Sequence, residues 1–94
     1  MFKKLLILLS FAAAAASAKP VLTVYTYSSF NTQWGAGPGL KAAFEKVCDC
    51  EVKYVALDHG VMILNRLRQE GEQNGADVII GIDNTLMQTA LDTG

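Results

Sequence analysis

Two cysteines, Cys48 and Cys50, stand one residue apart in the 94-residue chain and are its only thiols. In an oxidising compartment such a pair can close a small disulfide ring, and a strained ring is easier to reduce. Redox enzymes more typically carry Cys-x-x-Cys at a helix start, and a metal site needs more ligands than this pair and the single histidine, His59, supply. We therefore expect either a structural disulfide or two buried thiols, and disfavour redox catalysis and metal binding.

A second group of polar residues, Asp58, His59 and Gly60, lies between a predicted strand and a predicted helix. Free N–H groups and the dipole at such a helix start favour an anion, and a glycine lets a ligand approach the backbone closely. A phosphate group would suit this loop. The alternative is that Asp58 caps the helix with its side chain and that His59 is a solvated loop residue.

Other side chains suited to ligand binding stand at the ends of two apolar runs. Tyr27 and Ser28 close the first run, where the Tyr27 ring can stack on a ligand or pack in the core. Asn84 follows a later run next to Asp83, and a helix cap is the favoured role there. The Trp34 ring could stack on an aromatic ligand or have a structural role.

Alternating strand and helix patterns must position these residues. A β-branched and aromatic run predicts a strand at 21–27, and a segment rich in Ser, Asn and Gly predicts a loop at 28–39. Pro38 suits the first turn of a helix that follows. Further along, the patterns predict strands at 51–56 and 77–82 and helices at 61–70 and about 86–91. The run at 77–82 has the character of a buried strand.

The first predicted helix carries a clear apolar periodicity. Residues spaced i, i+3, i+4 and i+7 form one face, and they are Leu40, Ala43, Phe44 and Val47. We expect this face to be the buried one. Lys41 and Glu45 stand four residues apart, and we expect them on the solvent side of the helix.

The order of these elements, β-α-β-α-β-α, predicts an α/β fold. Short apolar strands joined by helices form a parallel sheet with helices on both faces, and ligands bind beyond the carboxyl ends of its strands. The loops at 28–34, 58–60 and 83–85 would therefore meet at one edge of the sheet and form the candidate site.

The composition excludes several classes of protein. With 51% hydrophobic and 18% charged residues and a net charge of −1, the chain is too apolar for intrinsic disorder. It also lacks the basic excess of nucleic-acid-binding domains, whose pI is usually above about 9. Three short strands make only a thin core. We therefore interpret the chain as the amino-terminal piece of a larger protein.

Residues 1–18 have the layout of a secretory signal peptide. Lys3 and Lys4 precede a continuous apolar stretch, and small residues precede a cleavage site after Ala18. The apolar stretch is shorter than the roughly 20 residues that a membrane anchor needs. Cleavage would leave residues 19–94 as an exported segment with 6 Lys and Arg against 9 Asp and Glu, a net charge of −3.

Short motifs follow one another through the segment 19–94. They are Val-Leu-Thr-Val-Tyr-Thr-Tyr at 21–27, Trp-Gly at 34–35, Gly-Pro at 37–38, Cys-Asp-Cys at 48–50, Val-Ala-Leu at 55–57, Leu-Asn-Arg-Leu-Arg at 64–68, Ala-Asp-Val at 76–78 and Gly-Ile-Asp-Asn at 81–84. In this order they resemble the start of the mature periplasmic thiamine-binding proteins, the substrate-binding components of bacterial thiamine ABC transporters. The resemblance covers essentially all of the segment and the amino-terminal part of the family's length.

The resemblance implies the fold and function of a type II periplasmic binding protein. Residues 19–94 would be an incomplete part of its first lobe, a three-layer α/β/α unit, and the two lobes would close on the ligand by a hinge. The ligand would be thiamine, thiamine monophosphate or thiamine diphosphate, with no cofactor. The partner would be the membrane permease of the ABC transporter, and we expect a periplasmic monomer that binds no nucleic acid.

The same resemblance points to part of the binding site. The family's contact before the second helix maps onto His59 and Gly60. The family's main aromatic contacts come from the second lobe, so the resemblance implies a structural role for Trp34. An acidic residue is expected at position 59. Here the acidic residue, Asp58, is one position earlier, so only the backbone role of position 59 carries over directly.

Other functions remain open at this stage. The chain could belong to a binding protein for another small solute, such as iron or another anion, or be a truncated product that binds nothing. An enzyme of thiol or small-molecule chemistry is disfavoured, because the cysteine pair would be its only candidate catalytic group. We therefore expect a binding protein and no catalytic residues.

Overall fold

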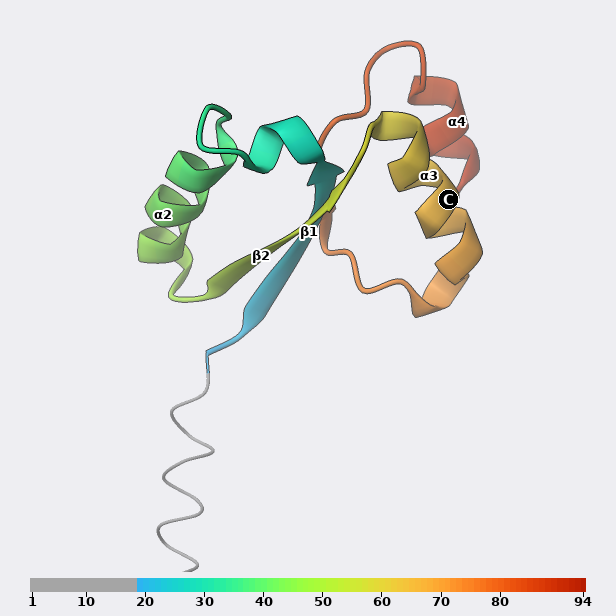
Figure 1. Cartoon of the computed structure of the whole chain (residues 1–94). Coiled ribbons are helices and arrows are strands. Elements are labelled where there is room, and N and C mark those ends of the chain that lie inside the picture. The colour runs from blue at the N-terminus through green and yellow to red at the C-terminus, as the bar shows by residue number, and fades with distance from the viewer. Residues whose placement is uncertain (1–18) are drawn as a thin grey trace, which may run out of the picture.

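The computed structural model describes residues 19–94, so the predicted signal peptide lies outside the described residues. Three strands, β1 (Val21–Tyr27), β2 (Glu51–Leu57) and β3 (Val78–Ile79), form one sheet in the order β2-β1-β3. The helices are α2 (Gly37–Cys48), α3 (Gly60–Glu70) and α4 (Met87–Asp92), with short 3₁₀ helices at Ser28–Asn31 (η1) and Gly71–Gln73 (η2). Figure 1 shows how these elements are arranged.

The sheet is parallel throughout, as predicted. β1 pairs with β2 along its whole length, from Val21 opposite Glu51 to Tyr27 opposite Leu57. β1 also pairs with β3 on its other side, where Val24 lies opposite Val78. Strand β1 is therefore central, and the side chains near its middle are the most buried of the strand.

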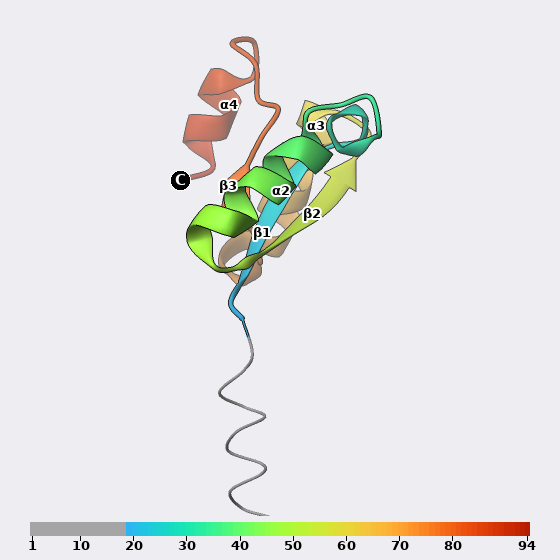
Figure 2. The same ribbon diagram turned by 90° about the vertical axis from the view of Figure 1, so that its left-hand side faces the viewer.

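Helices α2 and α3 cover opposite faces of this sheet, as Figure 2 shows. The apolar core contains Val24 and Tyr25 of β1, Val52 of β2, and Ile63 and Leu64 of α3. Because β1 alternates its side chains between the two faces, Val24 faces the α2 side and Tyr25 faces α3. The Tyr25 hydroxyl donates to Glu70 Oε1 of α3 at 2.8 Å.

Tyr25 also contacts a second side chain of α3. The guanidinium carbon of Arg66 lies 5.0 Å from the centroid of the Tyr25 ring, and Arg66 Nε donates to Glu70 Oε2 at 3.3 Å. The hydrogen bond to Glu70 is the largest cause of a raised pKa at the Tyr25 phenol, with burial as the second cause.

The third strand differs from the prediction of a buried strand at 77–82. Only Val78 and Ile79 form β3, and Val78 is exposed. The backbone N–H groups of Asp77 and Ile80 still bond to β1 carbonyls. Gly81 then adopts a φ of +117°, which ends the extended conformation. The apolar composition predicted the strand but not this bend.

The apolar face of α2 also differs from the prediction. Leu40, Phe44 and Val47 are 49%, 41% and 82% exposed, and Ala43 is exposed as well. Leu40 and Phe44 line an open apolar groove of about 190 Å³. Its other walls are the strand residues Leu22, Val24, Val52, Tyr54 and Val78, and Ile80 just after β3. The periodicity predicted the helix correctly, but this face is only partly covered.

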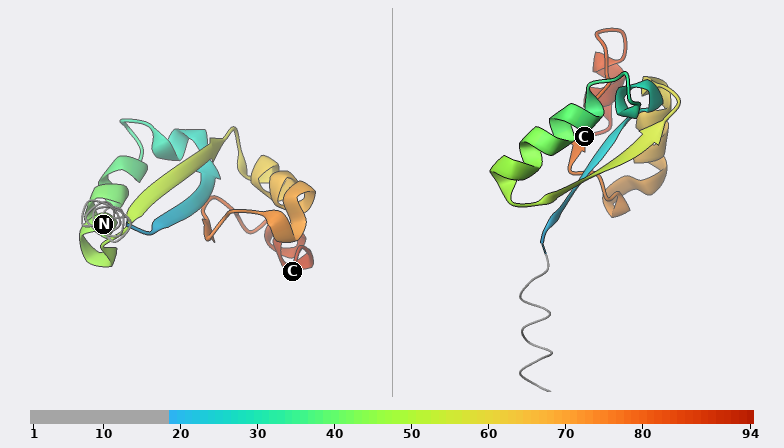
Figure 3. Two further views of the ribbon diagram at one scale, coloured as in Figure 1. Left: turned by 90° about the horizontal axis from the view of Figure 1, so that it is seen from below. Right: turned by 60° about the vertical axis from the view of Figure 1, so that its left-hand side comes forward.

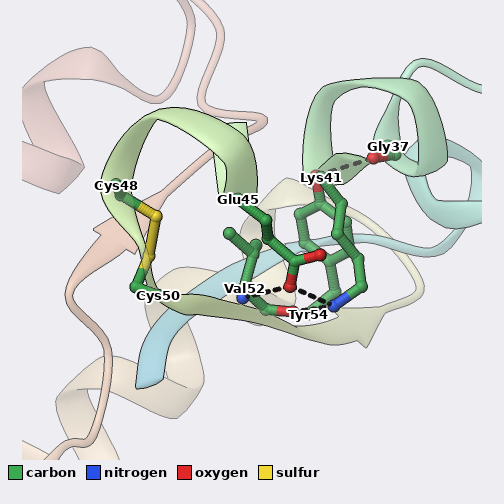
Figure 4. Close-up of polar contacts among 7 residues, drawn as sticks. All are labelled: Gly37, Lys41, Glu45, Cys48, Cys50, Val52 and Tyr54. Atoms are coloured by element: carbon green, nitrogen blue, oxygen red, sulfur yellow. Dashed lines mark hydrogen bonds and ion pairs between the residues drawn. A yellow bond between two sulfur atoms is a disulfide. The ribbon is translucent and has the colours of Figure 1, made fainter. Parts of the chain in front are cut away.

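Lys41 and Glu45 were predicted on the solvent side of α2, but their half-buried side chains also bond to the backbone of β2. Glu45 Oε2 accepts a hydrogen bond from Val52 N at 2.8 Å, and Lys41 Nζ donates to the Val52 carbonyl oxygen. Lys41 and Glu45 also form an ion pair at 2.9 Å. Figure 4 shows both side chains reaching from α2 to β2. Helix α2 lies beside the outer edge of β2, so these polar groups meet unpaired backbone groups.

Candidate binding edge of the sheet

Three segments converge at the carboxyl ends of the strands, where the sequence predicted the site. A Cβ added to Gly60 would lie 2.5 Å from Gly81 O, and one added to Gly81 would collide with Tyr27 Cδ1. The end of β1, the start of α3 and the segment after β3 are therefore in direct contact at this edge. Figure 3 shows the same elements from two other sides.

Of these three residues, Tyr27 and Gly60 were predicted site residues and Gly81 was not. The sequence did carry a signal for Gly81, since a glycine inside an apolar run often marks a bend or a close backbone approach. Its positive φ and its contact with the Tyr27 ring require a residue without a side chain. Gly81 therefore positions the Tyr27 ring at this edge.

The loop before α3 presents both of its polar side chains to solvent. Asp58 and His59 are exposed, and His59 occupies the N-cap position of α3 with no side-chain hydrogen bond capping the helix. The alternative in which Asp58 caps α3 is therefore not observed. The first turn is closed by the backbone instead, where Met62 N donates to His59 O at 3.0 Å.

Asp83 does not cap a helix as the sequence predicted, because the N-cap of α4 is Leu86 and no side chain caps it. Asp83 instead holds the turn that precedes α4. Its Oδ1 accepts from Thr85 N at 3.0 Å, from Thr85 Oγ1 at 2.6 Å and from Leu86 N at 3.2 Å. The hydrogen bond from the Thr85 side chain is the main cause that lowers the pKa of Asp83. Asn84 is exposed at the tip of this turn, and Ser28 is exposed at the start of η1.

An aromatic row that sequence reasoning missed supports this edge. The Phe30 ring packs edge-on against Tyr27 and Tyr54, with centroids 5.7 Å apart in each pair. The Tyr54 hydroxyl donates to Gly37 O at 2.9 Å, which ties β2 to the start of α2. The row supports the Tyr27 ring through Phe30, three residues later, and through Tyr54 on the neighbouring strand.

Trp34 does not have the structural role that we expected. It is 89% exposed, in the loop between η1 and α2. This loop is held by its own backbone, since Gly35 N donates to Thr32 O at 3.0 Å. A Cβ on Gly37 would lie 2.6 Å from Phe30 O. The loop therefore packs tightly while its largest side chain stays in solvent.

Cys48 and Cys50 form a disulfide at the junction of α2 and β2. Residue Asp49 between them has a φ of +50°. Within residues 19–94, no three His, Cys, Asp or Glu residues gather where they could hold a metal ion. No helix among these residues is both long and apolar enough to cross a membrane.

No protein-family profile matches the chain, but individual proteins do. It is 58% identical over 93 residues to a thiamine-binding periplasmic protein of Salmonella typhimurium and 56% identical over 94 residues to one of Escherichia coli. A third, from Haemophilus influenzae, is 40% identical over 83 residues. These matches cover 99%, 100% and 87% of the chain.

The chain belongs to the family of periplasmic thiamine-binding proteins.

A solved structure of a family member has the same fold as this chain. A protein described as a periplasmic thiamin binding protein matches with a TM-score of 0.77 and 58% identity, over 83% of this chain. The α/β fold with a parallel sheet and helices on both faces is therefore that of part of a lobe in this family. The relatives are named as binding proteins rather than as enzymes.

The chain spans only part of its relatives in the thiamine-binding family. It covers 28% of the length of the Salmonella protein and 29% of the Escherichia coli protein. It covers 24% of the matched chain in the solved structure.

Proposed function

We propose that the chain is the amino-terminal part of the first lobe of a periplasmic solute-binding protein for thiamine or its phosphate esters. The observation that carries this proposal is the 58% identity over 99% of the chain with a relative named for thiamine binding. The protein would deliver its ligand to the membrane permease of an ABC importer. It would act as a monomer and release the ligand chemically unchanged.

In this proposal residues 1–18 are a signal peptide cleaved after Ala18, and residues 19–94 belong to the lobe. The open groove beside α2 supports the second assignment. Leu40 and Phe44 of α2 and Val78 of β3 leave 49%, 41% and 40% of their surfaces exposed there. Other parts of a full-length protein would cover these side chains, because a contiguous exposed apolar patch usually marks a surface that packs against another segment or protein.

The binding edge would contribute one wall of the ligand cleft. We assign the backbone N–H groups at His59 and Gly60 to the phosphate of a thiamine ester, because the start of α3 attracts anions. The Tyr27 ring would contact the aromatic part of the ligand. Asp58, Ser28 and Asn84 are exposed polar residues at the same edge, and they would supply weaker contacts to the ligand.

A chimera tests this function independently of the chain's length. Residues 19–94 would replace the matching segment of the Escherichia coli relative, and thiamine and thiamine monophosphate would be titrated by calorimetry. We expect saturable binding within about tenfold of the parent affinity, a difference of about 1.4 kcal/mol. A folded chimera that binds neither compound would contradict the proposal.

A further measurement separates binding from catalysis. The chimera would be incubated with thiamine, and the molecular mass of the recovered ligand would then be measured by mass spectrometry. Unchanged thiamine is the expected result. A cleaved or modified product that is absent from the parent protein would show that these residues bring catalysis.

A further inference from the structure

The outer edge of β2 has its backbone groups covered by two side chains, Lys41 and Glu45, which we call the edge clamp. β2 pairs with β1 on one side only, so the N–H and C=O of Val52 point away from the sheet. Val52 is only 4% exposed, and buried backbone groups without a partner are costly. Glu45 accepts from the Val52 N–H, and Lys41 donates to the Val52 oxygen.

The clamp depends on how α2 is joined to β2. Glu45 lies one helical turn before Cys48, the last residue of α2, and Val52 lies two residues after Cys50. The disulfide therefore closes the connection immediately beside the clamp, as Figure 4 shows. Asp49, between the cysteines, is the C-cap of α2 and adopts the left-handed φ of +50°. Many helices end in this conformation, although few non-glycine residues besides Asn and Asp adopt it.

We propose that the Cys48–Cys50 disulfide is a redox-sensitive latch for the edge clamp. With the disulfide closed, Asp49 is held in its left-handed conformation and the end of α2 stays in register with β2. With the disulfide open, Asp49 is free to leave that conformation, the last turn of α2 moves away from β2, and Val52 loses its partners. An uncovered strand edge is a template for pairing with another chain.

Opening the latch is a two-electron reduction by a dithiol. A thiolate of the dithiol attacks one cysteine sulfur, and the S–S bond breaks. The other cysteine leaves as a thiolate and takes up a proton. The second thiolate of the dithiol then attacks the mixed disulfide, which releases the remaining cysteine and leaves the reductant as a cyclic disulfide. The protein gains two electrons and two protons in total.

The position of the cysteines favours the closed state in an oxidising compartment. Cys48 ends α2, where the negative end of the helix dipole disfavours a thiolate. Redox enzymes use the opposite arrangement, with a cysteine at a helix start that stabilises the thiolate. The latch therefore opens only when a dithiol is supplied, and it is a conformational device with no catalytic role.

Amide hydrogen exchange at Val52 tests the latch directly. The reference is the amide of Ile80, which donates to Tyr25 O at 2.9 Å on the other side of β1. Exchange of both amides would be followed by NMR on the oxidised chain and on the chain reduced with dithiothreitol. We expect reduction to raise the exchange rate of the Val52 amide about tenfold and to change that of the Ile80 amide little. The reason is that local opening exposes only the clamped group.

Two outcomes would overturn the proposal. Unchanged exchange at Val52 would mean that the clamp holds without the disulfide. Equal acceleration at Val52 and Ile80 would mean that reduction weakens the whole domain. The variant with both Cys48→Ser and Cys50→Ser should reproduce the reduced pattern without any reductant in the sample.

A clamp variant completes a thermodynamic cycle. Glu45→Ala removes the acceptor of the Val52 N–H, so Val52 should exchange faster even with the disulfide closed. Reduction of this variant should then raise the exchange rate of the Val52 amide by less than a further twofold, since the disulfide and the clamp act on the same group. A further acceleration as large as in the unchanged chain would show that the two are independent and would overturn the latch.

Discussion

Glu45 Oε2 lies 2.8 Å from the backbone nitrogen of Val52 and accepts its hydrogen bond. The same oxygen pairs with Lys41 Nζ at 2.9 Å. A helix side chain thus takes the place that a fourth strand would occupy beside Val52. This contact makes the edge of β2 sensitive to the charge of one carboxylate.

Acid should weaken the fold through Glu45. The hydrogen bond from Val52, followed by Lys41, lowers the pKa of Glu45 below its ordinary value of 4.5. A lowered pKa in the folded state gives a stabilisation that is present above the unfolded pKa and lost as the pH falls through the folded pKa. Urea unfolding of the wild type and Glu45→Gln at pH 7 and pH 3 measures this. The difference in unfolding free energy between the two proteins should be smaller at pH 3 than at pH 7. An equal difference at both pH values would contradict the prediction.

Removing the Tyr25 hydroxyl should destabilise the α3 face of the sheet. Tyr25 is 3% exposed and donates to Glu70, so Tyr25→Phe should cost about 1 kcal/mol of unfolding free energy. Denaturant unfolding gives this number. The matched control is Glu70→Gln, which keeps an acceptor for the hydroxyl and should cost less. A larger loss in the control would mean that the charge of Glu70 matters more than the hydrogen bond.

Gly81 should be intolerant of any side chain. Gly81→Ala places a Cβ against the Tyr27 ring in a backbone with a φ of +117°, and we expect a loss of about 1–3 kcal/mol in unfolding free energy. Gly39→Ala in α2 is the control, because nothing lies within 4 Å of the added Cβ, and alanine favours a helix. The control should be neutral or stabilising. Equal losses in the two variants would contradict the packing argument.

Trp34 should behave in solution as an exposed indole. It is the only tryptophan in the chain and is 89% exposed, so its fluorescence should be that of an indole in water and should be quenched readily by acrylamide. Trp34→Phe should change the unfolding free energy by less than about 0.5 kcal/mol. A blue-shifted, poorly quenched emission would show that the ring is covered in solution.

Short-range patterns in the sequence were sufficient for the order of the elements. The β-branched run predicted β1 at 21–27 with its observed bounds, and the periodicity from Val61 predicted α3 to within one residue. These signals are reliable because backbone preference and side-chain alternation act within a few residues. The parallel sheet then follows, because helices that connect successive strands return the chain to the same end.

For the candidate site, the sequence located the loops but not their contacts. Tyr27 and Gly60 lie at the predicted edge, yet their contact through Gly81 depends on a bend at one residue. The exposed Trp34 and the short β3 were also not predicted. Hydrophobicity indicates which residues favour burial, whereas the neighbours that would bury them depend on the packing of distant segments.

The sequence by itself determined which segments are strands and helices, and which loops stand beyond the strand ends. Only the tertiary structure decided that Lys41 and Glu45 contact the edge of β2, and that Gly81 holds the Tyr27 ring. The physical reason is distance along the chain. Local preferences act over a turn or a strand, whereas Val52 and Gly81 meet their partners only after the crossovers have brought separate segments together.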